Sequence, residues 1–343
     1  MDHRTGIHGG RGADGGIDGA RANTQARGTG GGRAACGGVR LSGHGHGLLG
    51  ENSANVGNLR PIIGPRPALA SQPINRPAPL KPLGRVRSWA MDDLVPRPPT
   101  GRVFAGTRRV RLADVSPAGR LRLDGAARFL QDLSADDTAD AALPDAEAWV
   151  VRKTMIVVES FPAYLESMAL VTWCSGTGSH WAERRISMHG ERGGVLEAAT
   201  TWVKLNRATG RPARIPAGFE KIYGEAAGSR RVTARLDHPE VAPSGASAFR
   251  WPLRVTDFDV LHHVNNAVYW QIVEEALALR RDLRAPVRAE VQHRTAIERG
   301  SEVHVSTAPL ADGGLGLWVV ADGRLAATAQ VHPGGSGVAS ESR

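Results

Sequence analysis

Cysteine is scarce in this chain of 343 residues, which contains only Cys36 and Cys174. Two cysteines exclude a disulfide framework and a four-cysteine zinc site. Long apolar runs are also missing, since no stretch approaches the ~18 uninterrupted apolar residues that a membrane-spanning helix needs. We therefore expect a cytoplasmic protein that does not span a membrane.

Aromatic residues and acidic charge are sparse in the first 90 residues, where Trp89 is the only one of eight tryptophans. This segment holds 20 of the 42 glycines, and 12 basic residues against 4 acidic ones. Such a composition cannot bury enough apolar surface to offset its chain entropy. We expect a disordered tail over residues 1–99, Gly/Arg-rich and then Pro-rich, with Met91 as an alternative start of translation. Residues 334–343 are expected to form a second disordered tail.

The remainder of the chain has no excess of charge of either sign, because residues 91–343 contain 31 basic and 30 acidic side chains. General binding of nucleic acid needs a clustered excess of Lys and Arg. The charge balance therefore argues against a nucleic-acid partner. These residues are numerous enough to bury a sizeable core.

The same order of elements occurs twice: a strand, a long helix and a run of four strands. Apolar spacing predicts helices over residues 123–143 and 264–281. Runs of β-branched residues bounded by Gly and Pro predict strands, at 148–158, 167–177, 180–190 and 195–206 in the first half and 287–295, 302–309, 314–321 and 324–332 in the second. Strand-like residues also precede each helix, at 108–121 and 250–259.

This order predicts an α+β fold of two tandem units, in which a curved antiparallel sheet wraps each long helix. We expect the first unit at residues 100–215 and the second at 248–333. A proline-containing linker over 216–247 would connect them.

The densest polar cluster is residues 256–266, TDFDVLHHVNN, between a predicted strand and the second helix. Asn265 or Asn266 can cap that helix through a side-chain oxygen. The amino end of a helix presents free N–H groups, which suit a developing oxyanion. Asp259 and His263 lie just before it. A carboxylate, an imidazole and an anion-binding helix end are together suited to acyl transfer.

The pattern Asp-x-Asp-x-x-x-His-Val-Asn-Asn-x-x-Tyr resembles the loop of hot-dog-fold thioesterases. Residues 201–216, TWVKLNRATGRPARIP, resemble the acyl-acyl-carrier-protein thioesterases of plants and bacteria. The resemblance covers about residues 103–333. It implies a double hot-dog fold and hydrolysis of fatty acyl-acyl-carrier-protein in fatty acid biosynthesis. It also implies an acidic carrier protein as partner, and a monomer or homodimer. We expect no cofactor, and no functional metal because the histidines at His44 and His46 lack an ordered ligand set.

Asp259 and His263 match the aspartate and histidine of the family's loop, so the resemblance implies that they are the catalytic residues. Asp259 would attack the thioester carbonyl or activate a water that does. The alternative is an aspartate that binds backbone N–H groups of its own turn. Leu261 stands where the plant enzymes have an asparagine. Ala296 and Ile297 stand where those enzymes have a glutamate and a cysteine.

Four further side chains are candidates for supporting roles. Asn265 and Asn266 are expected to organise the loop and the helix cap. Glu274 lies in a mostly apolar helix, where it either holds a water in the site or is exposed. Glu298 is a candidate replacement for the family's missing strand carboxylate.

Basic residues crowd the end of the second helix and the next strand, at Arg280, Arg281, Arg284 and Arg288. A basic patch would attract an acidic carrier protein. The alternative is a solvated helix end whose cations complement the helix dipole.

Two other functions remain open at this level. The same fold would serve an acyl-CoA thioesterase, or a module that binds acyl chains without hydrolysing them.

Overall fold

The computed structural model describes residues 94–143, 148–206 and 208–334. Most of the predicted tail, with Met91, and residues 335–343 lie outside the described residues. Of the predicted tail, residues 94–99 are described, and the carbonyl oxygen of Val95 accepts a hydrogen bond from Arg185 Nη1 at 2.9 Å.

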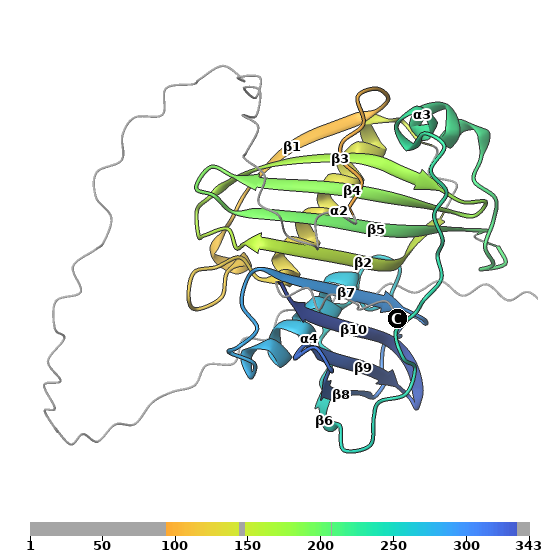
Figure 1. Ribbon diagram of the computed structural model, residues 1–343. Coiled ribbons are helices and arrows are strands. Elements are labelled where there is room, and N and C mark those ends of the chain that lie inside the picture. Colours follow the sequence, from red (N-terminus) through yellow and green to blue (C-terminus); the bar gives the residue numbers. More distant parts are fainter. Residues whose placement is uncertain (1–93, 144–147, 207, 335–343) are drawn as a thin grey trace, which may run out of the picture. The chain divides into compact units, whose positions relative to one another are not determined.

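Within these described ranges, ten strands form one antiparallel sheet, in the order β1-β3-β4-β5-β2-β7-β10-β9-β8-β6 (Figure 1). The strands of the first half are β1 (Val103–Arg109), β2 (Ala148–Ser160), β3 (Ser167–Thr177), β4 (Trp181–Gly190) and β5 (Val195–Leu205). Those of the second half are β6 (Ser247–Trp251), β7 (Val287–His293), β8 (Val303–Pro309), β9 (Leu315–Ala321) and β10 (Arg324–Pro333). The pairing of β2 with β7 joins the two halves.

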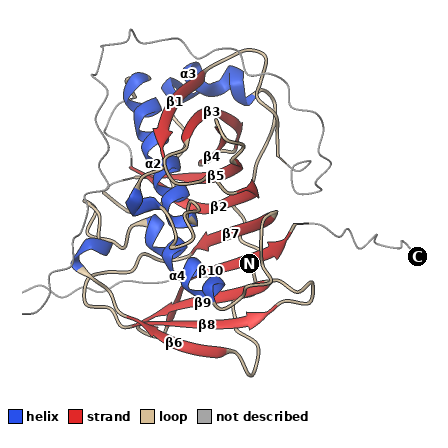
Figure 2. Cartoon of the chain, turned by 90° about the vertical axis from the view of Figure 1, so that its left-hand side faces the viewer, coloured by secondary structure: helices blue, strands red, loops and turns tan. Residues whose placement is uncertain are grey.

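Two helices lie on the same face of this sheet and contact each other, α2 (Leu123–Asp140) and α4 (Asn266–Ala278) (Figure 2). Their apolar stripes are buried, for example Leu130 and Leu133 of α2 and Trp270 of α4. Burial of one such stripe per helix against the sheet supplies most of the driving force for this arrangement. The tandem hot-dog fold predicted from the sequence is confirmed. No helix in the described part of the chain is long and apolar enough to cross a membrane.

The segments before the two helices differ from the prediction of strands over 108–121 and 250–259. Each strand ends earlier and is followed by a single 3₁₀ turn, at Leu112–Asp114 and at Val255–Asp257. The carboxylates of Asp114 and Asp257 accept the backbone N–H of the residue before each turn, at 2.9 and 2.8 Å. These side-chain bonds close the backbone into a turn and stop the strand.

The predicted linker at 216–247 contains an unpredicted helix, α3 (Ala217–Ala227). Pro216 stands at its N-cap, where the missing N–H of proline costs nothing. Phe219 and Tyr223, one turn apart, are buried, and the Tyr223 hydroxyl donates to Asp137 Oδ2 of α2 at 2.8 Å. The prolines around α3 favour a connection in the sequence, and its apolar face is too short to give a clear helical pattern.

Candidate active site

The loop between β6 and α4 is a tight turn held by its own backbone. The Asp259 N–H donates to the His263 carbonyl, and the His262 N–H donates to the Asp259 carbonyl, both at 3.0 Å. His262 has φ +62°, a left-handed conformation that is uncommon outside glycine, and its side chain is exposed. The Val264 N–H donates to the Ile297 carbonyl at 3.0 Å and ties the loop to the segment after β7.

The amino end of α4 is capped by Asn265, as predicted. Its Oδ1 accepts the Ala267 N–H at 2.9 Å, and its carbonyl accepts the Val268 N–H at 2.9 Å. Within the described residues, the Asn266 N–H has no acceptor. The helix dipole adds positive potential there, so this N–H is the group that is available to bind an anionic oxygen.

Asp259 is half-buried at the start of the turn. Its Oδ1 accepts the Leu261 N–H at 2.9 Å, which is the local contact that a purely structural aspartate would make. Its Oδ2 has no partner among the described residues. Leu261, in the place of the family's asparagine, is 59% exposed. The turn contact thus occupies one carboxylate oxygen and leaves the other for chemistry.

His263 and Glu298 are neighbours across an isolated antiparallel bridge. Glu298 is exposed, and it lies in the loop after β7, which ends at His293, rather than on a strand. Glu298 stays a candidate replacement for the family's carboxylate, from a loop position beside His263. The side chains of His263 and Glu298 have no hydrogen-bond partner in the described ranges.

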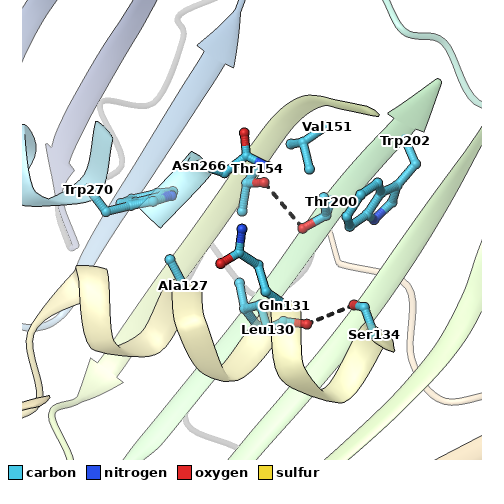
Figure 3. Close-up of a pocket in the computed structure, with 10 residues that line it drawn as sticks. All are labelled: Ala127, Leu130, Gln131, Ser134, Val151, Thr154, Thr200, Trp202, Asn266 and Trp270. Carbon is cyan, nitrogen blue, oxygen red and sulfur yellow. Dashed lines mark hydrogen bonds between the residues drawn. The ribbon is translucent and has the colours of Figure 1, made fainter. Parts of the chain in front are cut away.

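A small cavity lies beside the amino end of α4, between α2 and the strands β2 and β5 (Figure 3). Its volume is about 20 Å³, enough for about one water molecule. The lining includes Asn266 and Trp270 of α4, Gln131 of α2, and Thr154, Thr200 and Trp202 of the sheet. The hydroxyls of Thr154 and Thr200 form a hydrogen bond of 3.3 Å.

Sequence reasoning missed the three polar residues that the first half contributes to this cavity, Gln131, Thr154 and Thr200. They lie far from residues 256–266 in the chain and belong to no local motif. A hint was present in α2, where the apolar spacing placed Gln131 next to a buried face.

The loop before α2 repeats the loop before α4, with residue numbers that differ by 143 (257 minus 114 for the two buried aspartates). In the first loop, the Ser116 N–H donates to the Arg120 carbonyl at 2.8 Å. In the second loop, the Asp259 N–H donates to the His263 carbonyl at 3.0 Å. Gly119, with φ +78°, occupies the left-handed position that His262 occupies in the second loop.

The two loops therefore share a backbone but differ in their side chains. Ser116 replaces Asp259, and Arg120 replaces His263. Only the second loop carries a carboxylate and an imidazole at these places.

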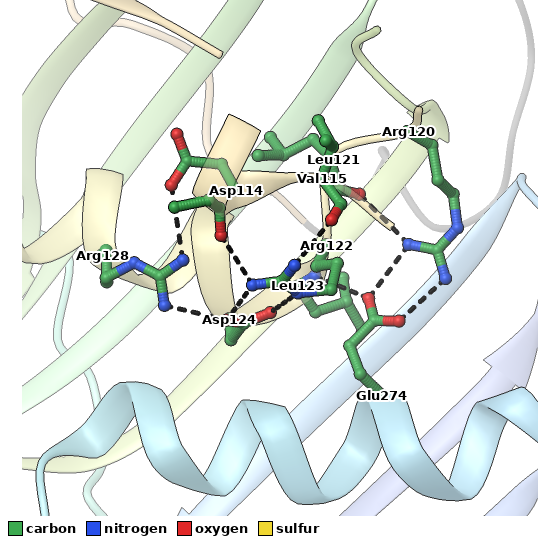
Figure 4. A network of polar contacts seen from close by, with 10 residues as sticks. Asp114, Val115, Arg120, Leu121, Arg122, Leu123, Asp124, Arg128 and Glu274 are labelled. Atoms are coloured by element: carbon green, nitrogen blue, oxygen red, sulfur yellow. Dashed lines mark hydrogen bonds and ion pairs between the residues drawn. The ribbon is translucent and has the colours of Figure 1, made fainter. Parts of the chain in front are cut away.

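The amino end of α2 is closed by a carboxylate from the other half (Figure 4). The Leu123 N–H, which corresponds to that of Asn266, donates to Glu274 Oε1 at 2.7 Å. Arg120 donates to both oxygens of Glu274, at 3.0 and 2.8 Å. Glu274 is thus half-buried and ion-paired rather than exposed. It lies about 12 Å along α4 from Asn266, so it does not support Asp259 directly.

The acidic and basic side chains around the start of α2 form a further network (Figure 4). Asp124 is 1% exposed and accepts hydrogen bonds from Arg122 and Arg128. Burial alone would raise the pKa of Asp124, but the two guanidinium groups outweigh it and hold that pKa below its ordinary value. This network fixes the first loop as a structural element.

The predicted docking arginines do not all remain available. Arg280 donates to the carbonyls of Gly313 and Gly314 at 2.6 and 3.2 Å and pairs with Asp282. Arg288 lies on β7, 3.7 Å from a Glu290 oxygen.

Arg281 and Arg284 are exposed. They follow the carboxyl end of α4, whose last residue lies about 18 Å along the helix from Asn266. Of the four predicted arginines, these two are the better candidates for contact with a partner.

Comparisons with known proteins agree with this architecture. The model of the acyl-ACP thioesterase N-terminal domain matches residues 101–223, and that of the C-terminal domain matches residues 243–329. An uncharacterized protein of Mycobacterium tuberculosis is 31% identical over 215 residues, which are 62% of this chain and 85% of the relative. The chloroplastic palmitoyl-acyl carrier protein thioesterase of Arabidopsis thaliana is 29% identical over 137 residues, 35% of this chain and 31% of that protein.

Among solved structures, the 12:0-ACP thioesterase of Umbellularia californica has a similar fold, with a TM-score of 0.57 and 20% identity. The superposition covers 67% of this chain and 96% of the other. The resemblance seen in residues 201–216 is confirmed over both halves. The chain belongs to the acyl-ACP thioesterase family.

Proposed function

We propose that this protein hydrolyses fatty acyl-acyl-carrier-protein and releases a free fatty acid and the carrier protein, in fatty acid biosynthesis. Family membership supports the reaction class. The observation that carries the proposal is the amino end of α4. There the Asn266 N–H, which has no partner in the described part of the chain, follows Asp259 and His263, whereas the corresponding N–H of Leu123 donates to a carboxylate oxygen at 2.7 Å. That oxygen stands where an oxyanion would bind.

In the proposed reaction, the thioester carbonyl oxygen accepts the Asn266 N–H. Asp259 removes a proton from a water whose oxygen bonds to the carbonyl carbon, and the negative charge that develops is held at the helix end. Collapse of this intermediate breaks the carbon–sulfur bond. The departing thiolate takes up a proton from His263. Direct attack by Asp259 would lead to the same products through an anhydride that water then hydrolyses.

The acyl chain is proposed to enter between α2 and the sheet, at the cavity beside Asn266. A volume of about 20 Å³ is too small for a fatty acyl chain, so lining side chains must turn aside on binding. Trp202 of β5 and Leu130 of α2 are the side chains proposed to move, because both are large apolar members of the lining. The length of chain accepted would depend on how far they move.

The carrier protein is the proposed partner, with Arg281 and Arg284 as its docking cations. A cytoplasmic monomer or homodimer is the expected form, since each chain already contains the pair of hot-dog units. An acyl-CoA thioesterase would use the same site and would need no docking surface for a protein.

The decisive experiment is hydrolysis of a panel of acyl-carrier-protein and acyl-CoA thioesters of varied chain length. We expect the carrier-protein thioesters to have the higher kcat/KM. The variant Asp259→Asn should lower kcat by roughly 10²–10⁴, the range for the loss of a general base. Asp322→Asn is a matched control, because Asp322 also lies in an exposed turn and accepts a backbone N–H through one oxygen.

Three outcomes would contradict the proposal. Full activity of a folded Asp259→Asn protein would remove Asp259 from the mechanism. A higher kcat/KM for CoA thioesters would favour the acyl-CoA thioesterase. Binding of acyl thioesters without hydrolysis would indicate a non-catalytic acyl-binding module.

A further inference from the structure

The internal duplication gives Gln131 a counterpart. Glu274 on α4 and Gln131 on α2 differ by the same 143 residues that relate the two loops (274 minus 131). Glu274 reaches across to the first N–H of α2. The same relation directs Gln131 toward the first N–H of α4, that of Asn266.

Two observations besides the numbering place Gln131 there. Gln131 and Asn266 line the same cavity, and the Gln131 carboxamide points from α2 into that cavity (Figure 3). Glutamine has the same number of non-hydrogen side-chain atoms as glutamate. Its carboxamide can therefore extend as far from the helix as the Glu274 carboxylate, whose oxygen lies 2.7 Å from the Leu123 nitrogen. Within the described residues, the Gln131 carboxamide has no hydrogen-bond partner.

We propose that Gln131 is a second oxyanion donor, whose Nε2 hydrogen-bonds the same thioester carbonyl oxygen as the Asn266 N–H. This inference rests on the proposed function and adds a catalytic residue from the first half of the chain to a site whose other groups come from the second half. Two donors that converge on one oxygen form the usual arrangement of an oxyanion hole.

The chemistry at the two helix ends explains why the residue directed at the α2 end is an acid, Glu274, and the residue directed at the α4 end is an amide, Gln131. At α2, the Glu274 carboxylate occupies the oxyanion position itself, and Arg120 neutralises it. At α4, His263 occupies the position that corresponds to Arg120. A carboxylate at position 131 would repel the negative charge that develops on the oxyanion. A neutral amide supplies a donor instead. The duplication thus yields one closed end and one end that can bind substrate.

The test compares Gln131→Met and Gln131→Glu with wild type, and with Gln271→Met as a matched control on α4. Loss of one oxyanion donor lowers kcat by about 10²–10³, so we expect that fall in Gln131→Met with KM little changed. Gln271→Met should retain the wild-type kcat. Thermal unfolding of each variant shows whether the fold is intact.

Gln131→Glu provides a readout that a structural role would not produce. The ionised carboxylate should accept the Asn266 N–H, as Glu274 accepts that of Leu123, and block the oxyanion position at neutral pH. The protonated carboxyl regains an O–H donor. The kcat of this variant relative to wild type should therefore rise as the pH falls through the range in which a glutamate carboxyl is protonated.

Several results would overturn the inference. These are a wild-type kcat in Gln131→Met, a pH-independent ratio in Gln131→Glu, or a change confined to KM and chain-length preference, which would make Gln131 a wall of the acyl cavity only. Such results with an inactive Asp259→Asn variant would reject the role of Gln131 and leave the proposed function standing. An inactive wild type, or a fully active Asp259→Asn variant, would reject the proposed function itself.

Discussion

Arg120 and Glu274 are 154 residues apart in the chain and form a bidentate ion pair, with nitrogen–oxygen distances of 3.0 and 2.8 Å. Arg120 belongs to the loop before α2, and Glu274 belongs to α4, so the pair joins the two halves of the duplication. Glu274 also accepts the Leu123 N–H. In the first half, the amino end of the helix is therefore occupied by an internal contact between the two halves.

The ion pair should contribute measurably to stability. Glu274→Ala leaves the Leu123 N–H without its acceptor and Arg120 without its partner, and we expect the free energy of unfolding to fall by about 1–3 kcal/mol. The expected loss of stability is modest because the Arg120 side chain is 31% exposed, and solvent screening weakens the ion pair. Urea denaturation of Glu274→Ala, Arg120→Ala and the double variant would measure it. Strictly additive losses in that cycle would mean that the two side chains are not coupled.

Stability should fall in acid because of His293 at the end of β7. Burial, with a smaller contribution from the nearby positive charge of Arg152, lowers the pKa of His293 from its ordinary 6.5 to about 4. The unfolded chain therefore binds a proton that the folded chain rejects between these two pH values. The free energy of unfolding is therefore unaffected by the titration of His293 above pH 6.5. It falls by about 3 kcal/mol in total as the pH falls from 6.5 toward 4.

The His293 ring packs edge-on against Tyr269 in the first turns of α4, with ring centroids 4.7 Å apart. Denaturation midpoints at a series of pH values would show the loss, and His293→Gln should flatten the dependence below pH 6.5. His304→Gln, which changes an exposed histidine on β8, is the control. An unchanged slope in His293→Gln would contradict the prediction.

Charge reversal at the carboxyl end of α4 tests the docking of the carrier protein. The variant with Arg281→Glu and Arg284→Glu should raise KM for a carrier-protein thioester severalfold and leave that of a small thioester unchanged, because the repulsion affects only an acidic protein. The effect should shrink as salt is added. Steady-state kinetics with both substrates would measure it, and equal changes for the two would reject docking at this surface.

Much of the fold could be predicted from the sequence because its signals are local. The apolar spacing in α2 and α4 and the β-branched runs that became β2–β5 and β7–β10 reflect burial of one face of each element. The cap of α4 by Asn265 was also predictable, since a cap needs only the side chain and the next turn of backbone. The short helix α3 was missed because prolines surround it.

The candidate site divides in the same way. Asp259, His263 and Asn265 lie within one short loop, so the sequence alone brought them together and indicated thioester chemistry. The departures at Leu261 and Ala296 were visible as well. The tertiary structure decided that Glu274 closes the end of α2 and that Gln131 shares a cavity with Asn266. Contacts between side chains so distant in the chain depend on the packing of α2 against α4 across the joined sheets, and no local pattern encodes that packing.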